Sequence, residues 1–204
     1  MIGRGESQYS YEENTIVIHA LDAIRAINEA RQNAVVVSTM TPNRYWQAVT
    51  TNNDLDLPIF GAMGKASSVA LGLALARPDK KILVLDGDGG LLMNLGSLVT
   101  ISEKEPGNLV HFVFEDGVYF TTGGQPTPGA GKINLAGMAK DAGFRESYDI
   151  DNLEDLVNEL PNIMNEEGPI FVCLKIIQGQ EIPEVYIGDT GEAMKRIAAK
   201  LREE

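Results

Sequence analysis

The 204 residues suffice for one domain with a full hydrophobic core and leave little room for a second. A net charge of −12 argues against a surface that binds nucleic acid or anionic membranes, and no apolar run is long enough to predict a transmembrane helix. The single cysteine, Cys173, excludes an internal disulfide, and the polar N-terminus carries no signal-peptide core, so we expect a cytoplasmic protein.

The first part of the chain predicts a flexible leader over residues 1–13, followed by alternating helices and strands. Val17, Leu21, Ile24 and Ile27 recur at helical spacing, and Asn14 is a suitable N-cap. We expect, in chain order, a helix over 14–31, a buried strand over 34–38, a short helix opened by Pro42, a strand over 57–60 and a small-residue helix over 65–76.

The same alternation continues to the C-terminus. We expect a strand over 82–85, a helix over 91–103, a strand over 109–114, a Gly/Pro loop over 123–131, a helix over 134–142, a strand over 144–148, a helix over 152–165, a strand over 170–176 and an exposed amphipathic helix over 191–202. Strands that alternate with helices predict an α/β fold, a doubly wound parallel sheet with helices on both faces. Residues 14–204 are expected to form this single domain.

Two successive predicted strands end in an acidic residue beside glycines. The first runs into GDGG at 87–90 and the second into EDG at 115–117. Because the carboxyl ends of parallel strands meet at one edge of a sheet, Asp88 and Asp116 are expected to lie there together. Glycines allow close approach of a ligand, a helix N-terminus favours phosphate, and carboxylates suit Mg²⁺. The pattern therefore predicts a site for a divalent metal and a diphosphate.

The spacing from this GDG to Asp116 resembles the metal-binding motif of thiamine-diphosphate enzymes, in which GDG is followed later by Asn. The run GAMGKASSVALGLALARPDKKILVLDGDG at 61–89 resembles the diphosphate-binding domain of the same family. Within the family, LLMNLGSL at 91–98 and GVYFTTGGQPT at 117–127 resemble the sulfopyruvate and phosphonopyruvate decarboxylases. The resemblance covers about 35–144 and implies that 14–204 form a thiamine-diphosphate-binding domain.

The resemblance also implies a role for individual residues. Mg²⁺ would be bound by the side chains of Asp88 and Asp116 and by the carbonyl of Val118. Gly61 would accept a hydrogen bond from the cofactor's aminopyrimidine, and Met63 would lie between the two cofactor rings and impose their bent conformation, unless it simply packs in the core. The other implied cofactor-binding residues are Thr39, Gly87, Gly89, Gly90 and Tyr119.

Three residues depart from the family pattern. Asp116 stands where Asn is usual, and its extra negative charge is expected to strengthen metal binding and weaken binding of the anionic cofactor. Met40 and Phe120 each stand where glycine is common, and Phe120 is expected to narrow the substrate pocket. These departures bear on substrate and activity more than on fold.

The resemblance implies that a second chain completes the active site. The family's catalytic glutamate lies on a separate pyrimidine-binding domain, and some members are split into two subunits. This chain would then be the beta-type subunit of a 2-oxoacid decarboxylase that converts sulfopyruvate or phosphonopyruvate to the aldehyde and CO₂. A pyrimidine-binding alpha-type subunit would supply the glutamate, in a hetero-oligomer with at least two copies of each chain. Either this interface or packing within the chain explains a set of small residues: Gly64, Ala66, Ala70, Gly72 and Ala74.

Further residues are candidates for substrate contact or for purely structural roles. Lys65 and Lys132 are candidates for binding a sulfonate or phosphonate, and Thr121–Thr122 follow the metal loop closely enough to face the substrate. We expect His19, in the first helix, and His111, in a strand, to be structural. Cys173 is expected to be a buried, inert thiol.

Other functions remain open on the sequence alone. One is a different thiamine reaction, such as a carboligase of the acetolactate type, and another is a degenerate subunit that binds a partner without catalysis. A nicotinamide- or flavin-binding protein is disfavoured because no G-x-G-x-x-G follows the early strand. A serine hydrolase is disfavoured by the lack of G-x-S-x-G, and a zinc site by the few histidines and cysteines.

Overall fold

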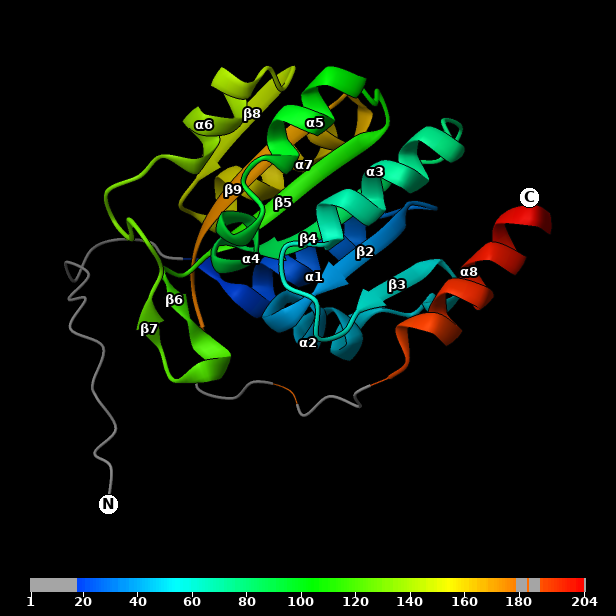
Figure 1. Cartoon of the computed structure of the whole chain (residues 1–204), viewed down its shortest axis with the longest axis horizontal. Coiled ribbons are helices and arrows are strands. Elements are labelled where there is room, and N and C mark those ends of the chain that lie inside the picture. Colours follow the sequence, from blue (N-terminus) through cyan, green and yellow to red (C-terminus); the bar gives the residue numbers. More distant parts are fainter. Residues whose placement is uncertain (1–17, 179–182, 184–187, 204) are drawn as a thin grey trace.

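A computed structural model describes residues 18–178, 183 and 188–203 (Figure 1). Its first elements are β1 (Ile18–His19), α1 (Ala20–Ala30), β2 (Val35–Thr39), α2 (Met40–Val49), η1 (Asn53–Leu55), β3 (Asp56–Ile59), α3 (Ala66–Ala76), β4 (Ile82–Gly87), α4 (Asp88–Met93) and α5 (Ser97–Lys104). The later elements are β5 (Leu109–Glu115), β6 (Val118–Tyr119), η2 (Phe120–Thr122), β7 (Gln125–Pro126), α6 (Leu135–Ala142), β8 (Glu146–Ile150), α7 (Leu153–Asn165), β9 (Ile170–Ile177) and α8 (Thr190–Glu203).

Seven of the strands in the described ranges form one parallel sheet, in the order β1-β9-β5-β4-β2-β3. The seventh strand, β8, pairs with the first part of β9. Strand β1 pairs with the last residues of β9 along the same edge of that strand. Every pair is parallel, so the carboxyl ends of β2, β4, β5 and β9 meet at one edge of the sheet. The predicted doubly wound parallel sheet is confirmed.

Alternate residues of each strand point to opposite faces, and each face has its own apolar core. Val35 and Val37 belong to the core that α3, α5, α6 and α8 cover, whereas Val36 belongs to the core that α1, α2 and α7 cover. Strands buried on both faces explain the continuous apolar runs in the sequence. Ala193 and Ile197 of α8 are buried in the first core, so this helix is less exposed than expected. None of the described helices is both long and apolar enough to cross a membrane.

The N-terminal helix is shorter than predicted. Ile18 and His19 are extended because they pair with Ile176 and Ile177 at the end of β9, and α1 begins only at Ala20. The expectation that His19 lies in the first helix is therefore wrong. The leader over 1–13 and the N-cap Asn14 lie outside the described residues.

The helix predicted over 91–103 is two helices, and the first of them already begins at Asp88. Asn94 leaves the helical conformation, and its side-chain amide donates to the carbonyl of Gly64 at 2.8 Å and to the hydroxyl of Ser68 at 3.3 Å. This tertiary contact breaks the helix and ties the turn before α5 to the loop before α3. The sequence pattern had no sign of a contact between such distant segments.

Smaller differences affect three other segments. Helix α2 begins at Met40, two residues before Pro42, and β8 is displaced to Glu146–Ile150 because Phe144 instead packs edge-on against Phe171. Residues within the predicted Gly/Pro loop pair with β6 to form a short antiparallel hairpin, β6–β7. Among the small residues of α3, Ala66, Ala70 and Ala74 all face the core, which favours packing within the chain.

Candidate active site

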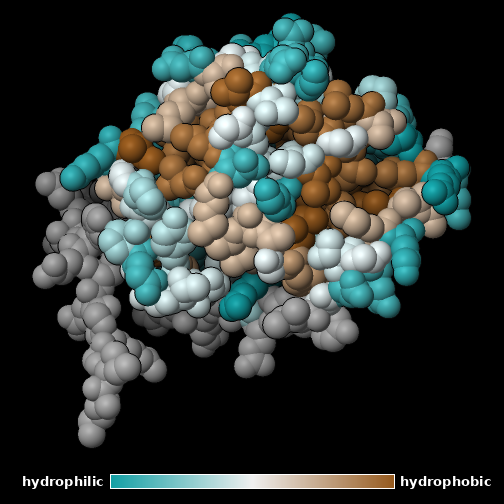
Figure 2. Space-filling view, in the orientation of Figure 1, coloured by the Kyte–Doolittle hydropathy of each residue, from teal (hydrophilic) through white to brown (hydrophobic). Residues whose placement is uncertain are grey.

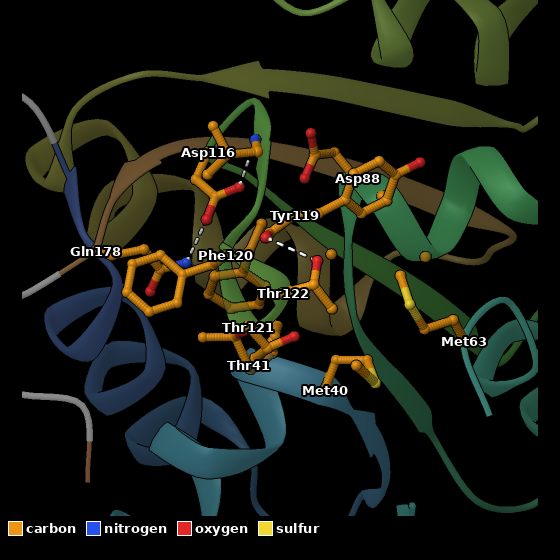
Figure 3. Close-up of a pocket in the computed structure, with 16 residues that line it drawn as sticks. Met40, Thr41, Met63, Asp88, Asp116, Tyr119, Phe120, Thr121, Thr122 and Gln178 are labelled. Carbon is orange, nitrogen blue, oxygen red and sulfur yellow. Dashed lines mark hydrogen bonds between the residues drawn. The ribbon is translucent and has the colours of Figure 1, made fainter. Parts of the chain in front are cut away.

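The carboxyl ends of the central strands open into a pocket (Figure 3). Eight of the predicted site residues line it: Met63, Gly87, Asp88, Gly89, Gly90, Asp116, Val118 and Tyr119. Thr121 and Thr122, the candidates for substrate contact, also line it, and six further residues complete the lining: Met40, Thr41, Pro42, Phe114, Phe120 and Gln178. Lys65 and Lys132, the candidate cations for a substrate tail, do not line this pocket.

Two predicted cofactor residues lie outside this lining. Thr39 is fully buried, and its hydroxyl donates to the carbonyl of Ile59 at 3.1 Å, which ties the end of β2 to β3. Gly61 is exposed on the loop after β3, with a φ of +66° that glycine adopts without strain. The side chain of Thr39 thus has a structural partner, and the role predicted for each residue stays a prediction.

Asp88 is the first residue of α4, and it is buried beside the other predicted metal ligand. Burial, followed by the negative charge of Asp116, raises the pKa of Asp88 to about 7. The hydroxyl of Thr127 donates to Oδ2 of Asp88 at 2.9 Å and favours the carboxylate form. Asp88 therefore has a hydroxyl donor in Thr127 and a neighbouring like charge in Asp116, and a bound cation would stabilise its carboxylate form.

Both carboxylate oxygens of Asp116 accept hydrogen bonds. The backbone amide of Val118 donates to Oδ1 at 3.1 Å, and Nε2 of Gln178 donates to Oδ2 at 2.6 Å (Figure 3). Burial raises the pKa of Asp116, and the bond from Gln178 opposes that rise. An Asn side chain has only one oxygen. Gln178 therefore donates to a second oxygen that Asp116 has and an Asn at this position would lack.

The glycines after Asp88 are required by the packing of the protein itself. A Cβ at Gly90 would lie 2.2 Å from Oδ1 of Asp86, and a Cβ at Gly89 would lie 2.6 Å from the ring of Tyr119. The hairpin that carries Tyr119 therefore folds directly onto the start of α4. Packing within the protein thus explains both glycines, and their role in admitting a ligand stays a prediction.

Sequence reasoning missed Thr127 and Gln178. Gln178 directly follows β9. Ligands bind beyond the carboxyl ends of parallel strands, and this rule, which located Asp88 and Asp116, would also have located Gln178 if it had been applied to the last predicted strand. Thr127 carried no such signal, because its position depends on the hairpin, which the sequence predicted only as a loop.

The residues expected to be structural lie away from the pocket lining. His111 is fully buried, burial lowers its pKa to about 3, and its Nε2 lies 3.9 Å from Oδ2 of the buried Asp86. Cys173 donates to Glu115 at 2.9 Å, and burial raises the pKa of its thiol. A protonated, buried thiol agrees with the prediction of an inert cysteine.

Residues 34–174 match the model of a protein family described as "Thiamine pyrophosphate enzyme, C-terminal TPP binding domain". The chain belongs to this family. The match covers the sheet from the start of β2 to near the end of β9, and it includes Asp88, Asp116 and Thr127.

Several members of the TPP-binding family are similar along most of this chain. Phosphonopyruvate decarboxylase of Streptomyces viridochromogenes is 38% identical over 155 residues, which are 76% of this chain and 38% of that protein. Sulfopyruvate decarboxylase subunit beta of Methanothermobacter thermautotrophicus is 31% identical over 188 residues, which are 92% of this chain and 97% of that subunit. The chain thus spans well under half of the first relative and nearly all of the second.

Solved structures show the fold of this TPP-binding domain in larger proteins. Benzoylformate decarboxylase from Polynucleobacter necessarius superposes with a TM-score of 0.69 at 17% sequence identity, over 88% of this chain and 36% of that one. A putative thiamin diphosphate-dependent enzyme from Mycobacterium smegmatis gives a TM-score of 0.67, also at 17% identity, over 80% of this chain and 32% of that one. At such identities the similarity establishes the fold alone.

Proposed function

We propose that this chain is the beta-type subunit of a split 2-oxoacid decarboxylase that uses thiamine diphosphate and Mg²⁺. Its substrate would be sulfopyruvate or phosphonopyruvate, which would be converted to the aldehyde and CO₂. The active site would be shared with a separate pyrimidine-binding subunit. When bound, thiamine diphosphate supplies the electron sink that loss of CO₂ from a 2-oxoacid requires.

The observation that carries this proposal is a pair of carboxylates at one pocket beside Met63: Asp88, which is buried, and Asp116, which is half-buried. Hard oxygen ligands suit Mg²⁺, and the like charge next to Asp88 favours a bound cation. Within the described residues, no three acidic, histidine or cysteine side chains form a metal cluster. The remaining ligands are therefore expected from the carbonyl of Val118 and from phosphate oxygens of the cofactor, so that metal and cofactor bind together.

Different residues of this chain would bind different parts of the cofactor near that metal. Gly89 and Gly90, at the start of α4, would bring backbone amides close to the diphosphate. The carbonyl of Gly61, an exposed residue, would accept a hydrogen bond from the aminopyrimidine, and Met63 would hold the two rings in their bent arrangement. Val118 and Tyr119 come from the hairpin that covers the start of α4 and would exclude water there.

A pyrimidine-binding alpha-type subunit would supply the missing catalytic glutamate. Two observations support such a partner. The first is that the matched region covers 97% of a subunit named beta but only 38% of a phosphonopyruvate decarboxylase. Apolar side chains are also exposed over α3, α4 and α5, including Leu75, Met93 and Val99 (Figure 2). We propose a cytoplasmic hetero-oligomer with at least two copies of each subunit.

The test begins with purification of the tagged chain from its native cells and mass analysis of the proteins that accompany it. A stoichiometric chain of about 150–200 residues is expected. The complex should release CO₂ from sulfopyruvate or phosphonopyruvate, and Asp88→Ala should abolish Mg²⁺-dependent cofactor binding while the exposed Asp151→Ala does not. A chain that emerges without a partner, or unchanged affinity in Asp88→Ala, would contradict the proposal.

A carboligase is the second candidate function, and one relative favours it. Acetolactate synthase isozyme 1 large subunit of Escherichia coli is 32% identical over 164 residues, which are 71% of this chain and 28% of that protein. Product analysis separates the two reactions, since ligation forms a carbon–carbon bond and decarboxylation alone releases an aldehyde. A non-catalytic subunit would bind no cofactor even with its partner present.

A further inference from the structure

Strand β3 lies at one edge of the sheet, and helix α8 runs beside it (Figure 1). The strand backbone at a sheet edge has N–H and C=O groups that no neighbouring strand pairs, so they need other partners. Side chains of α8 bond to backbone groups of three alternate residues along β3 and just beyond it: Asp56, Pro58 and Phe60. The helix therefore takes the place of a further strand.

Two side chains of α8 make these contacts. The guanidinium of Arg196 donates to the carbonyl of Asp56 at 3.3 Å. The hydroxyl of Thr190, the first residue of α8, donates to the carbonyl of Pro58 at 3.1 Å and accepts from the backbone amide of Phe60 at 3.0 Å. One hydroxyl thus holds the end of β3, from a position 130 residues later in the sequence than Phe60.

The loop between β3 and α3 begins directly after Phe60. Its four residues, 61–64, share no backbone–backbone hydrogen bond with the rest of the described chain. The far end of the loop is held by Asn94, whose side-chain amide donates to the carbonyl of Gly64 at 2.8 Å. Thr190 holds the near end, through the neighbouring Phe60. Side chains from two distant segments therefore fix both ends of this loop.

This loop carries two of the residues proposed to contact the cofactor. Met63 lines the pocket, and the carbonyl of Gly61 would accept a hydrogen bond from the aminopyrimidine. Because Gly61 follows Phe60 directly in the chain, a shift of Phe60 would displace that carbonyl. Misplacement by about 1 Å can cost a site about 100-fold when its function depends on orientation.

We propose that Thr190 is a positioning residue that sets the carbonyl of Gly61 where the aminopyrimidine can donate to it, so that α8 is a functional part of the cofactor site. The proposal rests on the proposed function, since it takes thiamine diphosphate as the ligand. Its structural basis is the pair of hydrogen bonds that the Thr190 hydroxyl makes with the end of β3. Thr190 does not line the pocket, so it acts through Phe60 and Gly61.

Three variants separate this positioning from the general attachment of α8. Thr190→Val removes the hydroxyl and keeps nearly the same shape, whereas Thr190→Ser keeps the hydroxyl. Arg196→Met is the matched control, because Arg196 also attaches α8 to the edge of the sheet, but through the carbonyls of Asn53 and Asp56 near the start of β3. Each variant is purified as the complex with its partner subunit.

The first readout is equilibrium binding, with Mg²⁺, of thiamine diphosphate and of an analogue in which hydrogen replaces the amino group of the pyrimidine. Only the former can donate to Gly61 through that group, so the ratio of the two affinities measures this hydrogen bond. We expect Thr190→Val to lower the ratio by about tenfold, the usual size of the effect of one hydrogen bond, and Thr190→Ser to restore most of it. Arg196→Met should keep the wild-type ratio, even where it lowers the unfolding temperature of the complex.

The second readout is hydrogen exchange, measured by mass spectrometry on the peptide that spans residues 57–64, and it needs no cofactor. Exchange should be faster in Thr190→Val than in the wild type, because the amide of Phe60 loses its acceptor. Thr190→Ser and Arg196→Met should exchange at rates near that of the wild type. Unchanged exchange in Thr190→Val would contradict the proposal.

An equal loss of affinity for both compounds in Thr190→Val would also overturn it, and so would an equal change of the ratio in Arg196→Met. Failure of the proposed function has a different signature. A wild-type complex that binds thiamine diphosphate but releases no CO₂ from sulfopyruvate or phosphonopyruvate would refute the decarboxylase, whereas a lowered ratio in Thr190→Val would still support the role of Thr190. A wild-type complex that binds neither compound would refute the cofactor and this proposal with it.

Discussion

The hydroxyl of Thr127 donates a 2.9 Å hydrogen bond to Oδ2 of Asp88, and both side chains are buried. Thr127 also donates its backbone amide to the carbonyl of Gly117 at 2.9 Å. One residue therefore joins the hairpin β6–β7 to the start of α4. The orientation of the proposed metal ligand depends on a loop that lies 39 residues away in sequence.

Thr127→Val removes that donor and keeps nearly the same shape. We expect affinity for thiamine diphosphate with Mg²⁺ to fall by about 10- to 100-fold, as is usual when a residue that orients a metal ligand is lost. Titration calorimetry on the complex measures this, and Thr127→Ser should restore most of the affinity. Equal affinities in the Val and Ser variants would show that the hydroxyl has no such role.

Asp116→Asn should preserve or improve cofactor binding. The neutral amide removes the charge that raises the pKa of Asp88, and its oxygen can still accept from the amide of Val118. Oε1 of Gln178 is buried without a hydrogen-bond partner, so rotation of the Gln178 amide would let it accept from the new side chain.

The double variant with Gln178→Leu tests that rotation. It leaves the amide introduced at position 116 without its partner, so the affinity of the double variant should fall below that of Asp116→Asn alone. A loss of binding in Asp116→Asn itself would instead mean that the second carboxylate oxygen is needed for the metal.

The chain without metal should lose stability as the pH rises toward neutrality. Burial raises the pKa of both Asp86 and Asp88 to about 7. A free Asp titrates near pH 4. From about pH 4 to the folded value, the folded chain retains protons that the unfolded chain has released, so the free energy of unfolding falls by up to about 1.4 kcal/mol per pH unit for each group.

Thermal unfolding between pH 4 and pH 8 checks this slope. Asp86→Asn should flatten it, with the exposed Asp54→Asn as the control for loss of one charge. Mg²⁺ with thiamine diphosphate should restore stability near and above pH 7, because the metal binds deprotonated carboxylates. Buried His111, whose pKa is lowered to about 3, opposes this slope up to about pH 6.5, because there the unfolded imidazole binds a proton that the folded one does not. An Asp86→Asn variant with the same slope as the wild type would contradict the contribution of buried Asp86.

Gly90→Ala should destabilise the fold by about 1–3 kcal/mol, because overpacking against the short side chain of Asp86 leaves little room to adjust. Gly89→Ala should be rescued by Tyr119→Ala, which removes the ring that the new methyl group would strike. Gly72→Ala is the control, since its Cβ would meet no atom within 4 Å, and it should stabilise α3 by about 0.5–1 kcal/mol. Urea unfolding measures all of these variants, and similar values at positions 72 and 90 would refute the packing argument.

Much of the site was predictable because it depends on strand ends. Once the strands before Asp88 and Asp116 are assigned to a parallel sheet, their meeting at one edge follows from topology alone. The same logic extends to Gln178, at the end of β9. Apolar runs therefore predicted both the sheet and the position of the two carboxylates.

The parts that were not predictable depend on contacts between distant side chains and loops. The break between α4 and α5 is made by Asn94 bonding to the carbonyl of Gly64, thirty residues earlier. The extended conformation of His19 requires β9, at the other end of the domain. The left-handed turn at Met40 is imposed by neighbouring strands, and no local propensity of methionine indicates it.

Strand β9 is the last of the described strands in the sequence, yet it lies inside the sheet. It is the partner through which both β1 and β8 join the other strands, and it covers the open edge of β5. Until β9 has been synthesised, β1 and β8 therefore have no partner strand in the sheet, and Asp116 lacks the hydrogen bond from Gln178. A chain synthesised only as far as Pro169 would contain both acidic residues, but neither Gln178 nor the strand that joins β1 and β8 to the rest of the sheet.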